Sequence, residues 1–166
     1  MNLKLSFQLP ILALLLSLPL LVRAQGATTN PQDGLPRVFL IGEQEDQFED
    51  LLSAYPQSLL EACEGDMGKA FERWIVMAAE IEAYAEKAEF DILGVKAWFH
   101  VFFDKTGRID HIAFHLKPES KNIELDELKD FLEEFAGQYQ FPLINDKNYQ
   151  NYSSVQFPLL YKGENN

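Results

Sequence analysis

The stretch from Val95 to Lys117 constrains the fold of this chain more than any other. β-branched and aromatic residues lie on both sides of the four residues Asp104-Lys105-Thr106-Gly107, and this pattern predicts a β-hairpin. Asp at the first turn position and Gly at the last suit a type I turn that ends at a positive φ. We therefore expect a sheet built around one antiparallel pair of strands.

The predicted hairpin has one apolar face and one mixed face, because alternate strand residues point to opposite sides. The apolar face consists of Val95, Ala97, Phe99, Val101, Phe103, Ile112, Phe114 and Leu116. The mixed face carries Lys96, Trp98, His100, Phe102, Ala113, His115 and Lys117. A one-residue bulge near Asp110 and His111 would bring Ile109 into phase, although residues 112–116 face the same way without it. An isolated hairpin is marginal in water, so we expect helices to cover the apolar face.

The rest of the chain predicts helices before and after the hairpin. The longest is expected from Asp66, as N-cap, to about Ile92. Its inward stripe is predicted to be Met67, Phe71, Trp74, Ala78, Ile81, Ala85 and Ala88. The other expected elements are a short strand at 37–41, helices at 43–53, 56–63 and 124–139, a polar loop at 145–152 and a strand at 153–157.

Together these elements predict an α+β fold. Its sheet is expected to have three antiparallel strands, from the hairpin 95–117 and a C-terminal strand near 153–157. The sheet is expected to pack against helices that include the long one near 66–92. The last strand is expected beside the first hairpin strand, with its outer edge open.

The first residues are typical of an export signal. Lys4 gives a positive start, an apolar run follows from 9 to 22, and Ala24 suits the position before a cleavage site. The run is shorter than the about 20 apolar residues of a membrane helix, so an uncleaved anchor is the alternative. We predict a signal peptide at 1–24, a flexible lead-in at 25–36 and a single α+β domain at 37–166.

The charge of the chain argues against several classes of partner. The whole chain has a net charge of −12, and removal of Lys4 and Arg23 leaves 12 basic against 26 acidic residues, a net charge of −14. Such a chain is unsuited to nucleic acid or anionic lipid, and we expect no stable membrane insertion after cleavage. Cys63 is the only cysteine, so we expect no internal disulfide and a buried thiol.

No pattern of residues predicts a catalytic, cofactor-binding or metal site. Asp104-Lys105-Thr106-Gly107 matches the start of the phosphorylated motif of cation-pumping ATPases, but the rest of that motif is missing and the turn explains these residues. On a strand, His111 and His115 lie about 13 Å apart, too far to share one zinc ion. His100 is the third and last histidine of the chain. It shares the mixed face with His115, but two ligands make a weak metal site.

The candidate partner-binding residues fall into two groups. On the mixed face they are Trp98, His100, Phe102 and His115, and on the last strand they are Ser154, Val155 and Gln156. The aromatic group predicts either an exposed patch for a partner or a surface covered by the long helix or the C-terminal tail. The strand predicts either a template for an added strand or an edge protected by polar residues and Pro158.

The order of these elements resembles the C-terminal domain of the TonB family over about residues 54–157. The matching features are Tyr55-Pro56, the alternating strand from Val95 to Phe103, Gly107-Arg108-Ile109-Asp110, Leu125-Asp126 and Phe141-Pro142. Two departures are the long helix near 66–92, where typical members have a short gap, and the lack of the family's retained anchor and Pro-rich spacer.

The resemblance implies a periplasmic or secreted protein of a Gram-negative-type bacterium that binds another protein or peptide. Because the anchor and spacer are missing, energy transduction is not implied. We expect a non-enzymatic binding module. The alternative is a small hydrolase or ligand-binding enzyme with a cleft between the long helix and the sheet, for which a His with a carboxylate or hydroxyl partner in a deep pocket would be the mark.

Overall fold

The computed structural model describes residues 34–43 and 45–160, which fall within one compact unit. The strands are β1 (Val38–Leu40), β2 (Gln57–Ser58), β3 (Lys96–Phe103), β4 (Ile109–Leu116) and β5 (Tyr149–Gln156). The helices are α1 (Glu45–Ala54), α2 (Leu59–Ala62), α3 (Met67–Lys87) and α4 (Leu125–Gln138). The predicted signal peptide at 1–24 and most of the lead-in at 25–36 lie outside the described residues.

The strands form one mixed sheet in the order β1-β4-β3-β5-β2. As predicted, β3 is antiparallel to β4 and to β5. However, β1 adds to β4 in parallel and β2 adds to β5 in parallel, so the predicted three-stranded antiparallel sheet is wrong. β1 lies within the short strand expected at 37–41, but its pairing with β4 was not predicted. β2 has only two residues, too few to show the alternation by which a strand is recognised.

β5 begins earlier than the sequence predicts, because residues 149–152 belong to the strand and not to a loop. Tyr149 is completely buried. Its ring stacks on that of Phe103 with the centroids 5.0 Å apart, and its hydroxyl donates to the carbonyl oxygen of Leu143 at 2.9 Å. One buried aromatic side chain therefore holds a polar stretch in the sheet, against its local preference.

The turn between β3 and β4 has the predicted chemistry. The Asp104 carboxylate accepts hydrogen bonds from the backbone of Thr106 at 2.8 Å and of Arg108 at 3.0 Å. Gly107 has φ +88°, and a Cβ there would lie 2.2 Å from the Phe141 carbonyl oxygen, so only glycine fits. The register shifts next to Asp110, which confirms the bulge.

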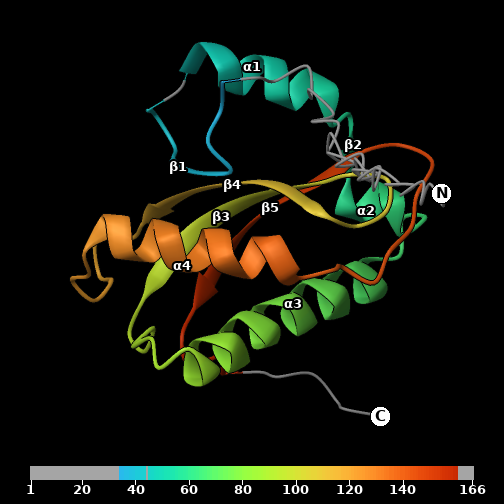
Figure 1. Cartoon of the computed structure of the whole chain (residues 1–166). Coiled ribbons are helices and arrows are strands. Elements are labelled where there is room, and N and C mark those ends of the chain that lie inside the picture. Colours follow the sequence, from blue (N-terminus) through green and yellow to red (C-terminus); the bar gives the residue numbers. More distant parts are fainter. Residues whose placement is uncertain (1–33, 44, 161–166) are drawn as a thin grey trace, which may run out of the picture. The chain divides into compact units, whose positions relative to one another are not determined.

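The sheet has a helical layer on each side (Figure 1). We call the side covered by α3 and α4 the α3 face, and the side covered by α1 the α1 face. The α3 face holds the larger core, which contains the whole predicted apolar row of the hairpin and Val155 of β5, with Leu116 partly buried. The smaller core under α1 consists of Phe39, Leu51, Tyr55, Phe102 and Ala113. Both faces of the central strand β3 are thus buried along most of its length.

The long helix α3 begins where the sequence predicts and ends about five residues early. The carboxylate of its N-cap, Asp66, accepts from the backbone of Lys69 at 3.0 Å, which satisfies one of the free N–H groups of the first turn. Glu89, two residues after the helix, has φ +55°.

Cys63, at the C-cap of α2, is free and buried, as predicted. Within residues 34–43 and 45–160, no helix has the combined length and hydropathy of a membrane span.

Phe99 tests the assignment of the two faces. It is completely buried in the larger core, so Phe99→Ala should lower the free energy of unfolding by about 3–5 kcal/mol. Phe71→Ala is the matched control, since that ring is 54% exposed, and it should cost less than half as much. Equal losses in urea unfolding would contradict the assignment.

Candidate functional site

Part of the mixed face of the hairpin is covered, and α1 covers it. The Phe102 side chain is completely buried, with its ring centroid 5.2 Å from that of Tyr55 and 6.1 Å from that of Phe48. The Tyr55 hydroxyl donates to the Asp110 carboxylate at 2.7 Å, so the bulged residue of β4 holds the chain that follows α1. Neither the long helix nor the C-terminal tail, the covers that the sequence suggested, lies over Phe102 in the described structure.

Two buried histidines lie at this covered part of the sheet. His100 Nε2 donates to the Gln150 side-chain oxygen at 2.8 Å, and His111 Nδ1 donates to the Pro36 carbonyl oxygen at 3.1 Å. Burial lowers the pKa of both imidazoles, and these hydrogen bonds oppose the effect only in part. Both side chains are therefore neutral structural groups at pH 7.

The remaining part of the mixed face lies at the surface. Trp98 stacks on Tyr152, with ring centroids 5.4 Å apart, and the Lys117 ammonium lies 4.8 Å from the centre of the Trp98 ring. Tyr152 is 50% exposed, and His115, the register partner of Trp98, is half-buried. The surface therefore presents two stacked rings next to a cation, and Tyr152 lies on β5 at the border of the sheet.

Most of the outer edge of β5 has no partner strand within the described residues, although α2 contacts β5. β2 pairs only with Tyr149 and Gln150, and no other described strand lies beyond residues 151–156. The Phe157 N–H donates to the Val95 carbonyl oxygen at 2.9 Å, which sets the phase of the antiparallel ladder. Because backbone groups alternate in direction along such a ladder, the N–H and C=O groups of 152, 154 and 156 point outward.

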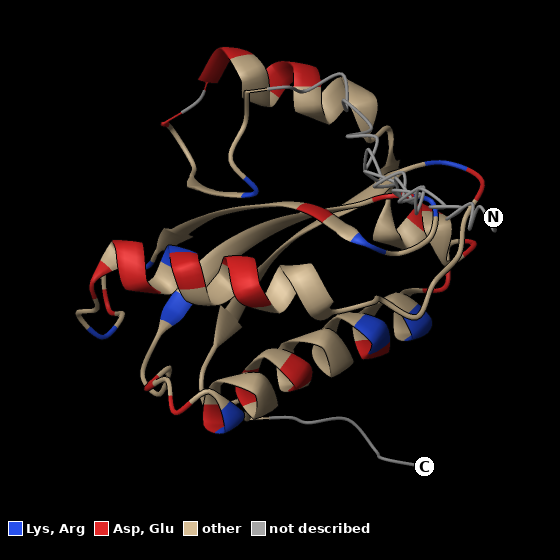
Figure 2. Ribbon diagram, in the orientation of Figure 1, with Lys and Arg blue, Asp and Glu red and all other residues tan. Residues whose placement is uncertain are grey.

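The open edge lacks the usual protection against pairing. β5 reads Tyr-Gln-Asn-Tyr-Ser-Ser-Val-Gln, with no charged residue and no proline. Edge strands commonly carry Lys or Pro, which deter the addition of another strand. In Figure 2 β5 has no blue or red segment, whereas acidic residues recur on α1, α3 and α4. An uncharged edge on a chain with net charge −12 is a local exception that favours pairing.

An apolar pocket of about 160 Å³ lies beside this edge on the α3 face. It is lined by Leu60, Met67, Ala70, Phe71, Trp74, Asn151 and Ser153. Met67 and Phe71 are 73% and 54% exposed, so the prediction that they face the core is wrong. Helical periodicity groups side chains on one face, and it cannot distinguish a face that packs on the sheet from one that lines an open pocket.

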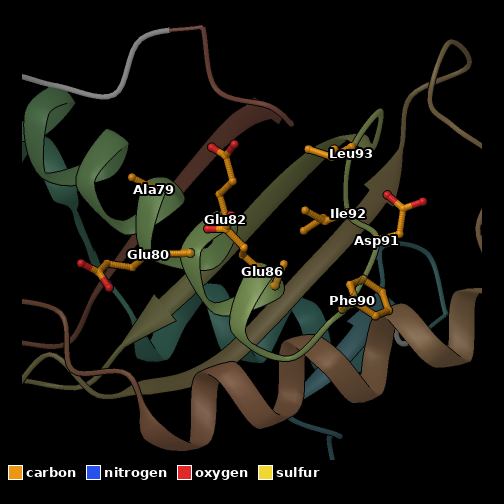
Figure 3. Close-up of a pocket in the computed structure, with 10 residues that line it drawn as sticks. Ala79, Glu80, Glu82, Glu86, Phe90, Asp91, Ile92 and Leu93 are labelled. Carbon is orange, nitrogen blue, oxygen red and sulfur yellow. The ribbon is translucent and has the colours of Figure 1, made fainter.

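A larger cavity of about 460 Å³ lies between the last turns of α3 and the loop that follows. Figure 3 shows Glu82 and Glu86 of α3 across from Ile92 and Leu93. This cavity contains carboxylates but no histidine, serine or cysteine, so it does not have the pairing that would favour a hydrolase. Among residues 34–43 and 45–160, no three His, Cys, Asp or Glu side chains are arranged to hold a metal ion.

The predicted partner-binding residues thus divide into surface and buried groups. Trp98, His115, Ser154 and Gln156 keep exposed surface, and the last two lie on the open edge. The side chains of His100, Phe102 and Val155 are buried and offer a partner almost no surface. Sequence reasoning missed Tyr152, which was assigned to a loop.

Comparisons with protein-family models, with curated proteins and with solved structures gave no match to this chain.

The buried histidines make stability depend on pH. The unfolded state has the ordinary histidine pKa of about 6.5 and binds more protons than the folded state, in which the pKa values of His100 and His111 are lowered. Their contribution is therefore present above about pH 6.5 and is lost as the pH falls through the folded values. Urea midpoints should fall between pH 7.5 and 5.5, a range in which exposed carboxylates stay ionised.

The control for this dependence is a set of histidine variants. The double variant with His100→Gln and His111→Gln should have a flatter profile, even if its stability at pH 7.5 is lower. His115→Gln, which changes the half-buried third histidine, is measured beside it as a substitution outside the covered part of the sheet. The same slope in the double variant and the wild type would contradict the assignment.

Proposed function

We propose that this protein is a binding module that holds an extended segment of a partner protein as an added strand along β5. The observation that carries the proposal is the open, uncharged edge at 151–156. Strand addition uses main-chain hydrogen bonds for affinity and side-chain pockets for specificity. The outward backbone groups of Tyr152, Ser154 and Gln156 supply the main-chain hydrogen bonds.

Both sides of the edge offer side-chain contacts to such a strand. On the α3 face, the side chains of an added strand next to Ser153 reach the apolar pocket with Met67 and Phe71. On the α1 face they reach Tyr152 and, behind it, Trp98. Alternate side chains of one extended peptide therefore meet two different surfaces, which supports selective binding of peptides.

The TonB-like interpretation of the sequence implies the same mode of binding and enters here as part of the proposal. So does export, on the ground of the predicted signal peptide at 1–24. In this proposal the module acts in the periplasm or outside the cell and binds a protein without converting it chemically. The cavity that faces Glu82 and Glu86 lacks a nucleophile and a histidine base, so the geometry favours binding over hydrolysis.

The test removes one outward N–H group. Ser154→Pro takes away the amide hydrogen at the centre of the open edge and leaves the ladder to β3 intact, since proline is tolerated at the outer side of edge strands. Purified wild-type protein should enrich peptides from a random library displayed on phage. Enriched peptides should bind the Ser154→Pro variant at least about ten-fold more weakly, and Ser154→Thr, which keeps the N–H, should bind them like the wild type.

Circular dichroism must show that both variants keep the wild-type fold. Binding that survives Ser154→Pro but is lost in Trp98→Ala would place the site on the aromatic surface and contradict strand addition. Failure to enrich any peptide would also contradict the proposal.

A further inference from the structure

A stripe of α3 follows the edge strand and changes from apolar to acidic along its length. Its members recur at spacings of three and four and are Met67, Phe71, Ile75, Ala79, Glu82 and Glu86. The stripe starts at the apolar pocket, where Phe71 lies with Ser153. Further along, the Glu82 carboxylate accepts from the Leu159 backbone N–H at 3.3 Å. It therefore extends from the middle of β5 to the chain just after that strand.

The acidic end carries two carboxylates, Glu82 and the exposed Glu86. Glu82 and Glu86 line the larger cavity with Asp91 (Figure 3). Asp91 already forms an ion pair with Lys121. Glu86 is exposed and has no ion-pair partner among the described residues. The apolar end of the stripe, in contrast, has no charged member between Met67 and Ala79.

The separation of the two ends fixes a spacing in the partner. Phe71 and Glu82 are eleven positions apart on α3, and this is about 16 Å at about 1.5 Å per residue. An extended peptide covers that distance in about five residues, at about 3.3 Å each. Side chains on the same face of a strand are an even number of residues apart, so the two partner residues that reach these ends are four or six apart.

We propose that the partner segment has a large apolar side chain and, four or six residues from it, a Lys or Arg. This inference rests on the proposed function and names the chemistry of the segment bound at that site. The apolar side chain enters the pocket of about 160 Å³, and a cavity of about 150 Å³ is large enough to hold a benzene ring. The basic side chain lies beside Glu82 and Glu86, and the peptide backbone pairs with β5.

Synthetic peptides of eight residues test the spacing and the charge. The reference peptide has Phe at position 2 and Lys at position 6 in a background of Ser, Thr and Val. Its reversal, with Lys at 2 and Phe at 6, covers the opposite strand direction. Matched peptides move Lys to position 5, replace Lys with Glu, or replace Phe with Ser. Dissociation constants are measured with the purified protein by fluorescence anisotropy.

The better of the two reference peptides should bind most tightly. The shifted Lys should weaken binding about two- to five-fold, which is the scale of an exposed ion pair, and Glu should weaken it further. Replacement of Phe should cost about ten-fold or more. Phe71→Ala should remove most of the preference for Phe. Glu86→Gln should reduce the preference for Lys over Glu, while Glu133→Gln, a change at an exposed acid on α4, should leave it unchanged.

The outcomes separate this inference from the proposed function. Suppose that peptides bind and that Ser154→Pro abolishes this binding, but that they show no preference for Lys over Glu or for even spacing. This result would overturn the partner chemistry and leave strand addition in place. If binding is unaffected by Ser154→Pro, or if no peptide binds, both are overturned.

Discussion

Burial of both faces of β3 determines how the rest of the domain is arranged. On the α3 face, Phe99 and Val101 belong to the larger core, and on the α1 face Phe102 belongs to the smaller one. A central strand of this kind needs a layer on each side. α1 has ten residues and spans about 15 Å, whereas the eight residues of β3 span about 26 Å. The contacts of Phe48 on α1 with this face include Phe39, His100 and Phe102, while Trp98 and Tyr152 stack on each other beside this covered part.

The sequence predicts the parts of this fold that depend on strong local patterns. The hairpin, its apolar row, its bulge, α3, α4 and the position of β5 beside β3 all follow from alternation, periodicity and turn residues. The sequence also predicts a short strand at 37–41, where β1 lies, but not its pairing with β4. It does not predict β2, because two residues show no period. The sequence also assigns Tyr149 to a polar loop, since its place in the strand depends on stacking with Phe103 from a distant part of the chain.

The candidate site shows the same limit in a different form. Apolar side chains at helical spacing predicted that Met67 and Phe71 belong to the core, but these two side chains border an open pocket. A docking surface and a core surface have the same hydrophobic pattern, and only the neighbouring elements distinguish them. The sequence predicts that the last strand has an open outer edge, and the structure limits the part without a partner strand to residues 151–156, because β2 pairs with Tyr149 and Gln150.

An open edge of a sheet is a liability for a protein unless it has a use, because it can pair with other chains. Here the chain as a whole is acidic, with a net charge of −12, and like charge opposes association between copies. The edge itself stays uncharged next to an apolar pocket. The proposed partner segment, with its Lys or Arg, has the charge opposite to that of the chain as a whole.

Amide hydrogen exchange along β5 in the free protein, followed by nuclear magnetic resonance, tests the central claim most directly. If the edge is open, the N–H groups of Tyr152, Ser154 and Gln156 exchange rapidly, because they point to solvent. Those of Ser153 and Val155 exchange slowly, since they donate to β3 within the sheet. Slow exchange at all five positions would show that the outer edge is already paired, and this would contradict the account.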